Sequence, residues 1–234
     1  MSFQRFNRAD DIVENQRTTI TSGLWTGGGT QLTTFFTASA AGEQTGSYLN
    51  IYNADPATDS SAEVQFSIGY ANINGSGSAG NTTKSTLGRR QTAALYGQFR
   101  NLLLAPNTNK FTFTGAPAAS SSGYNDFYFV SFNRARMREK VNPGNWELTL
   151  SGSTNNAKPT KLIDDSSTTS GVTVDQGGRV FNIVSGSIAN GVHVAAASQD
   201  KGSFGLFYPD LGILILNRDP IADSGSVATS LSAD

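Results

Sequence analysis

Alternation of apolar and polar residues dominates the chain from residue 48 onward and predicts β-strands. The clearest case is the segment 62–70, where Val64, Phe66, Ile68 and Tyr70 alternate with mostly polar or small residues. Further strands are expected between turns rich in glycine, asparagine and serine, at 48–52, 110–114, 126–132, 145–150, 160–164, 179–186, 191–196, 203–209 and 212–217. This spacing favours an antiparallel sandwich or a mixed sheet over alternating strand–helix units. The predicted fold class is mainly β.

A helical period occurs at 92–104, where Leu95, Phe99, Leu102 and Leu103 fall on one face of a helix that ends before Pro106. A second short helix is predicted at 8–16, with two aspartates in its first turn. We therefore expect one or two short helices beside the strands.

The distribution of glycine and small polar residues divides the chain into three parts. Three consecutive glycines lie among β-branched residues near the N-terminus, which predicts an arm or a pair of strands joined by a flexible turn. We assign residues 1–46 to this N-terminal arm or assembly segment, 47–220 to a β-rich body and 221–234 to a polar C-terminal tail.

Composition narrows the functional classes. Charged residues make up only 15% of the 234 residues, against about 25% in an ordinary soluble domain. The net charge of −1 argues against a general nucleic-acid binder, so no nucleic-acid partner is expected. The absence of cysteine excludes disulfides, thiol nucleophiles and thiolate metal sites. No signal-peptide pattern and no apolar run of membrane-spanning length occurs, so we expect synthesis in a cytoplasm without export and no membrane partner.

No pattern of catalytic residues emerges. His193 is the single histidine, and a zinc site needs several histidines or cysteines. The segment 75–85 has the composition of a phosphate-binding loop, but its lysine does not follow the last glycine directly. Asp164 and Asp165 are adjacent, so on a strand they point to opposite faces, and they are predicted to form a turn. We therefore expect a protein that is not an enzyme, with no catalytic residues, metal site or cofactor.

The segment 129–146, FVSFNRARMREKVNPGNW, concentrates positive charge at Arg134, Arg136, Arg138 and Lys140. As a strand it would place all four on one face, and as a helix it would stack them in like-charge pairs. In either form the cluster needs anions. Three remain open: acidic groups of the same chain, carboxylates of a neighbouring subunit, and, least favoured by the net charge, phosphates.

The end of the same segment predicts a turn. Asn142, Pro143 and Gly144 are turn-forming residues that would return Trp146 toward the core, so we interpret the whole segment as a hairpin. The loops at 120–128 and 141–146 also combine aromatic and amide side chains, a composition that suits sugar binding.

Three aromatic residues, Phe3, Phe6 and Trp25, lie in the N-terminal segment, which has little core pattern of its own. They either anchor on a partner or pack on their own domain. Together with the four basic residues they form the predicted protein-interface set.

Several runs of the sequence resemble virion structural proteins of contractile-tailed bacteriophages, particularly those that infect marine cyanobacteria. They are DDIVENQRTTITSGLWTGGGTQLTTFFTAS, YGQFRNLLLAP, FYFVSFNRARMREKVNPGNWELTLSG, LIDDSS, GRVFNIVSGS and FGLFYPDLGILILN. The resemblance implies a subunit of the phage particle that contacts other virion proteins and copies of itself, in the baseplate or tail. Capsid decoration, or a tail module that binds a host-surface receptor or glycan, is the alternative.

Overall fold

A computed structural model of the protein describes residues 36–37 (backbone only), 48–75, 92–117, 122–137, 139–150, 160–169, 172–198 and 200–223. Its strands are β1 (Phe36–Thr37), β2 (Tyr48–Tyr52), β3 (Val64–Asn72), β4 (Asp126–Phe132), β5 (Leu148–Leu150), β6 (Thr160–Asp164), β7 (Thr173–Asp175), β8 (Gly178–Ser187), β9 (Gly191–Val192), β10 (Gly205–Tyr208) and β11 (Ile213–Leu216). Its helices are α1 (Thr92–Leu103) and α2 (Arg218–Asp223), and single 3-10 turns occur at η2 (Arg134–Arg136) and η3 (Ala196–Ser198). The predicted helix at 8–16 lies outside the described residues.

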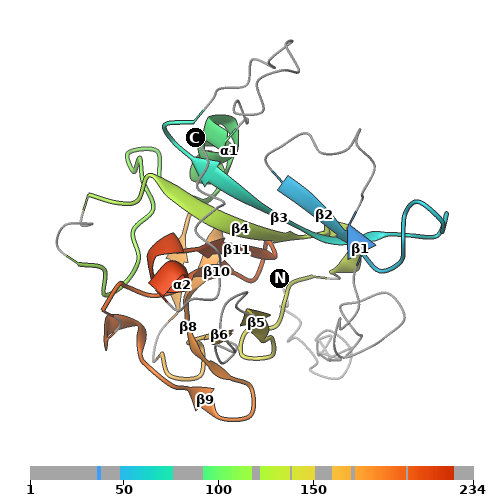
Figure 1. Ribbon diagram of the computed structural model, residues 1–234. Helices are drawn as coiled ribbons and strands as arrows, with labels where there is room; N and C mark the ends of the chain where they lie inside the picture. The colour runs from blue at the N-terminus through green and yellow to red at the C-terminus, as the bar shows by residue number, and fades with distance from the viewer. Residues whose placement is uncertain are drawn as a thin grey trace, which may run out of the picture.

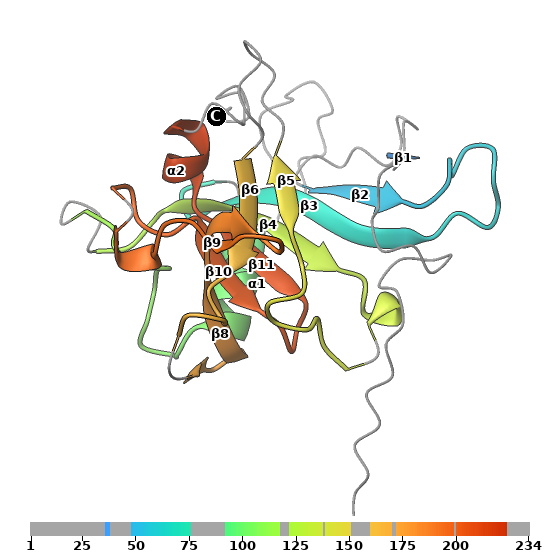
Figure 2. The same cartoon turned by 90° about the horizontal axis from the view of Figure 1, so that it is seen from below.

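The strands form one curled antiparallel sheet, which confirms the prediction of a mainly β fold. Its order is β1-β2-β3-β4-β11-β10-β8-β6-β5, while β7 and β9 pair with β8 at its two ends. Every pairing between described strands is antiparallel. The sheet turns so far that β5 and β6 run across the direction of β2 and β3 (Figures 1 and 2).

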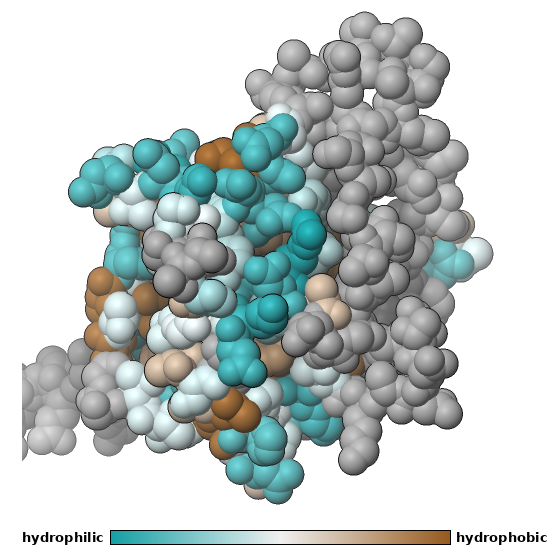
Figure 3. All heavy atoms as spheres, turned by 60° about the vertical axis from the view of Figure 1, so that its left-hand side comes forward, coloured by the Kyte–Doolittle hydropathy of each residue, from teal (hydrophilic) through white to brown (hydrophobic). Residues whose placement is uncertain are grey.

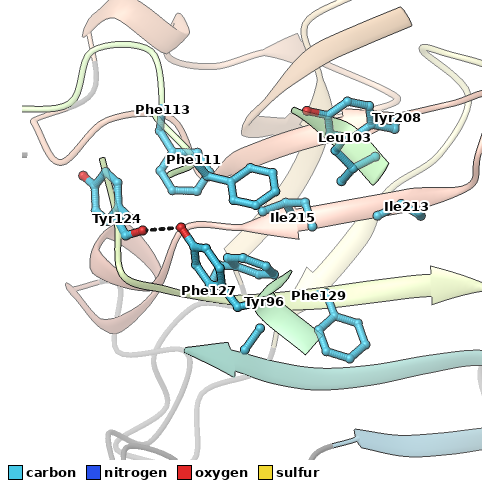
Figure 4. Packing of buried hydrophobic residues seen from close by; sticks show 11 residues of the cluster. Tyr96, Leu103, Phe111, Phe113, Tyr124, Phe127, Phe129, Tyr208, Ile213 and Ile215 are labelled. Carbon is cyan, nitrogen blue, oxygen red and sulfur yellow. Dashed lines mark hydrogen bonds between the residues drawn. The ribbon is translucent and has the colours of Figure 1, made fainter. Parts of the chain in front are cut away.

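One face of the sheet is covered by α1 and an aromatic cluster. In this cluster Tyr96 packs against Phe111 and Phe127, with ring centroids 5.9 and 5.1 Å away (Figure 4). The hydroxyl of Tyr96 is buried and donates a hydrogen bond of 2.7 Å to the carbonyl oxygen of Tyr124. Because a buried hydroxyl needs a partner, this bond both permits the burial of Tyr96 and fixes the loop that carries Tyr124.

The opposite face holds a second core at the centre of the curl. Its buried members are Val130, Met137, Val141, Leu162, Phe181, Ile183, Phe204, Phe207, Leu214, Leu216 and Ile221. They come from β4, β11, β10, β8 and β6, together with the loop after η2 and helix α2. Ile221 is only 1% exposed, so the predicted boundary between body and tail at residue 221 falls inside a helix that packs on the body.

Helix α1 confirms the predicted helical segment and three of the four residues predicted on its apolar face, because Leu103 is buried and Leu95 and Phe99 are partly buried against the aromatic cluster. Leu102 is 47% exposed, whereas Tyr96, which the prediction omitted, is 1% exposed. The buried positions are Thr92, Tyr96 and Leu103, with Phe99 partly buried between them. The helix packs with these residues toward the sheet because the large side chain of Tyr96 then enters the aromatic cluster.

Two predicted strands differ from the structure. The segment 110–114 forms no strand, and its Phe111 makes only an isolated bridge to Tyr124. The segment 191–196 forms only the two-residue strand β9 before it turns into η3. Both segments lie where the alternation is short, and their apolar residues pack without a continuous ladder.

The adjacent aspartates at the end of β6 and in the residue after it are buried and lie at the turn that the sequence predicts. The carboxylate of Asp164, 1% exposed, accepts hydrogen bonds from the backbone N–H groups of Gly144 (2.8 Å) and Ser166 (3.0 Å). Asp165 accepts instead from the backbone and side-chain amides of Asn182, at 2.9 and 2.8 Å. The two carboxylates therefore serve different partners and do not form an acid–base pair.

We predict that Asp164→Ala destabilises the protein by about 2 kcal/mol, because two backbone N–H groups at a buried site lose their acceptor. The matched control is Asp200→Ala, since Asp200 is exposed and its side chain makes no hydrogen bond or ion pair to a described residue. Urea unfolding followed by tryptophan fluorescence measures both. Equal unfolding midpoints for the two variants would contradict the structural role of Asp164.

Candidate interaction surface

The basic segment begins with η2, and Asn133 positions it. The Asn133 side chain accepts a hydrogen bond from the N–H of Ala135 (3.1 Å) and donates one to the carbonyl oxygen of Val64 (2.9 Å). Its backbone N–H donates to the carbonyl oxygen of Gln65 at 3.0 Å. One residue thus closes the β3–β4 ladder and caps the turn that carries Arg134 and Arg136. In Figure 2 this turn lies just beyond the arrowhead of β4.

The residues after η2 anchor the segment on the body. Met137 and Val141 are each 6% exposed and belong to the core inside the curl. The N–H of Val141 donates to the carbonyl oxygen of Pro209 at 3.0 Å. Gly212 has a φ of +66°, and a Cβ there would lie 2.3 Å from the Met137 sulfur, so glycine is required for this contact. The backbone under the basic side chains is therefore held at both ends.

The segment is neither a continued strand nor a long helix, because Met137 turns into the core between the charged residues. The four basic side chains therefore do not share the regular face that either form would give them. Arg134 is exposed, while Arg136 and Lys140 are partly buried. Arg138 lies outside the described residues, as do Phe3, Phe6 and Trp25.

Each described basic side chain has a different environment. Arg136 forms an ion pair of 2.7 Å with Glu63, an acidic group of the same chain. Arg134 donates from Nη1 to the carbonyl oxygen of Glu139 at 2.9 Å, and it contacts no carboxylate among the described residues. The anion that pairs with Arg136 is therefore an acidic group of the same chain, the first of the three predicted kinds. Arg134 has further guanidinium N–H groups for which no described residue is an acceptor.

Lys140 lies near a second charged pair. Arg179 hydrogen bonds to the carboxylate of Asp210 through Nε (3.0 Å) and Nη2. The pKa of Asp210 is lowered, first by the hydrogen bond from the Arg179 side chain and to a smaller extent by the charge of Lys140. The basic segment is thus continuous with the charged turn between β10 and β11.

The interpretation of 129–146 as a hairpin is wrong. Strand β4 pairs with β3 and β11, whereas β5 pairs with β6, so the chain crosses the curl between them. The predicted Asn-Pro-Gly turn is confirmed: Asn145 N–H donates to the carbonyl oxygen of Asn142 at 3.2 Å, and Gly144 has a φ of +76°. Trp146 does return to the core, where its ring lies 5.0 Å from that of Phe207.

Neither Tyr124 nor Trp146, the aromatic residues at the centre and end of the two loops, presents an exposed ring. Tyr124 is 7% exposed, and Trp146 is partly buried with an indole N–H that has no acceptor among the described residues. His193 is exposed, and its backbone N–H continues the sheet by donating to the carbonyl oxygen of Ser185 at 2.8 Å.

The described part of the chain contains no group of three or more acidic or histidine side chains placed to hold a metal ion. Within the same residues, no helix has both the length and the apolar character needed to cross a membrane. Comparison with protein-family models, with curated proteins and with solved structures finds no match for this chain.

The sequence did not reveal Glu63 as the partner of Arg136, nor Asn133 as a cap. Asn133 directly precedes the basic run, and an asparagine in that position is a signal from which the cap could have been predicted. The pairing with Glu63 depends on the register between β3 and β4, which no local pattern specifies.

We predict that Asp210→Asn weakens the protein at pH 7 but has little effect in strong acid. The lowered pKa of Asp210 means that its ionised form stabilises the fold above the unfolded value of 3.8, and this contribution is lost as pH falls through the lower folded value. Urea midpoints of wild type and variant should therefore converge as pH falls from 6 toward 2. Asp200→Asn is the control, and a difference for Asp210→Asn that does not depend on pH would contradict the prediction.

Proposed function

We propose that this protein is a non-enzymatic structural subunit of a tailed-phage particle, in the baseplate or tail, which assembles through protein–protein contacts. The resemblance of its sequence to virion proteins supports the proposal that the protein is part of a phage particle. The observation that supports the mode of assembly is Arg134: an exposed guanidinium on a capped, anchored turn, whose one acceptor among the described residues is a backbone carbonyl.

An arginine placed in this way suits a contact with a carboxylate on a neighbouring subunit. The guanidinium binds a carboxylate through two parallel hydrogen bonds and is less costly to dehydrate than a lysine ammonium group. The Asn133 cap and the buried Met137 hold the backbone in place before contact, so little ordering entropy is lost there on association.

The surface in Figure 3 is compatible with a polar mode of assembly. On the face drawn, the described residues are mainly hydrophilic or intermediate, and the hydrophobic areas are small and separated. Interfaces between separately folded subunits are about as polar as ordinary protein surface, with arginine enriched among their contacts. The partners proposed are other virion proteins and further copies of this chain.

The particle role can be tested directly. We predict that gradient-purified phage particles from the source culture contain this protein in stoichiometric amounts by mass spectrometry and that antibodies raised against it label the tail in electron micrographs. Exclusive recovery of the protein in the particle-free fraction would overturn the proposal. Labelling confined to the head would overturn the tail or baseplate assignment.

The contact role of Arg134 has its own test. We predict that Arg134→Glu reduces incorporation into particles about tenfold or more, because it places like charges at the proposed contact. Lys201→Glu is the matched control, since it makes the same change of charge at an exposed residue near the other end of β11. The unfolding midpoint of each variant should stay near that of wild type. Equal incorporation of both variants would remove Arg134 from the interface.

A further inference from the structure

A row of side chains runs from β3 across β4 to the start of α2, on the sheet face opposite α1. Antiparallel register places Asn72 opposite Asp126 and Tyr70 opposite Tyr128. On the other side of β4, Leu216 pairs with Tyr128, so Arg218 comes into line with Asp126 two residues later. We call Tyr70, Asn72, Asp126, Tyr128 and Arg218 the tyrosine–arginine cluster.

This face of β3 is the less covered one, although it carries the larger apolar side chains. Ala71, which points toward α1, is fully buried, while Ile68 on the opposite face is 36% exposed and Tyr70 is partly buried. An alternating strand normally turns its apolar residues into the core. Here α1 packs on the small residues, and the aromatic side is left partly open.

Hydrogen bonds fix the polar groups of the cluster relative to one another. The Tyr70 hydroxyl donates to Asp126 Oδ2 (2.8 Å) and accepts from Asn72 Nδ2 (3.0 Å). Arg218 Nη1 donates to the same Oδ2 at 2.6 Å. The rings of Tyr70 and Tyr128 lie side by side with centroids 5.6 Å apart, tilted by 49°. The cluster is therefore ordered before any ligand binds.

Several hydrogen-bonding groups remain unused. The Tyr128 hydroxyl, Asp126 Oδ1 and the other guanidinium nitrogens of Arg218 make no hydrogen bond to a described residue. The side chains of Asp126 and Arg218 are 19% and 38% exposed, so a ligand in solution can reach them. Burial is the main cause that raises the pKa values of Tyr70 and Tyr128 above the ordinary value of a phenol.

We infer that the tyrosine–arginine cluster binds a neutral saccharide. A pyranose ring has an apolar face of C–H groups, which packs on aromatic rings, and a rim of hydroxyls, each of which both donates and accepts hydrogen bonds. The unused carboxylate oxygen accepts from one hydroxyl, the guanidinium donates to its neighbour, and the Tyr128 hydroxyl serves a third. Charge-assisted hydrogen bonds of this kind are the stronger ones available to an uncharged ligand.

The size and charge of the cluster favour a saccharide over other ligands. A stable protein interface buries about 800 Å² on each partner. Among the large apolar side chains of β3 and β4, Ile68 is the one whose exposed fraction reaches 36%, so the apolar surface here is small by comparison. A phosphate is disfavoured because the charge of Arg218 is balanced by Asp126. The site lies at the end of β4 away from Arg134, so it can fail or succeed independently of the proposed assembly surface.

The test uses the full chain and a panel of methyl glycosides of common hexoses, N-acetylhexosamines and deoxyhexoses, with glycerol as an acyclic polyol. Saturation-transfer NMR detects binding, and titration calorimetry measures affinity. Tyr128→Phe removes only a hydroxyl without a described partner, so the fold should be retained. We predict a loss of affinity of about five- to tenfold, the usual effect of one hydrogen bond. Tyr48→Phe is the control, because Tyr48 is 49% exposed on the opposite face of the sheet.

Saturable binding of at least one glycoside, weakened by Tyr128→Phe and unchanged by Tyr48→Phe, would support the inference. Equal binding of glycerol, equal affinity of the two variants, or no binding at tens of millimolar glycoside would overturn it. It would also be overturned if Tyr128→Phe reduced incorporation into particles, since the cluster would then belong to a protein contact.

Discussion

Burial of the central strands on both faces is the constraint on which this fold depends. All four residues of β11 are buried, and its neighbours β4 and β10 each carry buried residues on both faces. A strand of this kind cannot have one face in water, so both sides of the sheet must be covered. Helix α1 covers one side. On the other side the sheet itself curls, which brings β5, β6 and the loop after η2 over the core.

This constraint explains much of what the sequence could and could not predict. The continuous apolar run at Ile213–Leu216 and the alternation at Val64–Tyr70 mark strands, and the apolar run before Pro106 marks a helix. Which side of β3 is covered is not encoded in its own alternation. It follows from where α1 packs, and the small residues around Ala71 allow that helix to approach closely. Local pattern thus predicts the elements, and long-range packing decides their faces.

The same distinction applies to the basic segment. Its charges and its Asn-Pro-Gly turn are visible in the sequence, but the apolar Met137 among those charges is what breaks the regular spacing and draws the chain inward. The pairing of Arg136 with Glu63 could not be predicted, because it depends on the register between β3 and β4, which are far apart in sequence. The proposed saccharide cluster is only partly visible: Asp126 and Tyr128 fall in the segment 120–128, whose composition suits sugar binding, whereas the other members come from β3 and the start of α2. Each alone is an ordinary polar or aromatic residue.

The two ends of the sheet are its shortest main-path strands: β1 has two residues and β5 has three. A long, flat edge would offer a template on which further strands could add without limit, as in fibrils. Within the described residues, these two edge strands offer few backbone groups in register. In the proposed assembly, copies of the chain would meet through side chains, whose shape and charge can define a fixed angle between neighbours. A fixed angle is the geometric condition for a ring that closes at a set number of subunits.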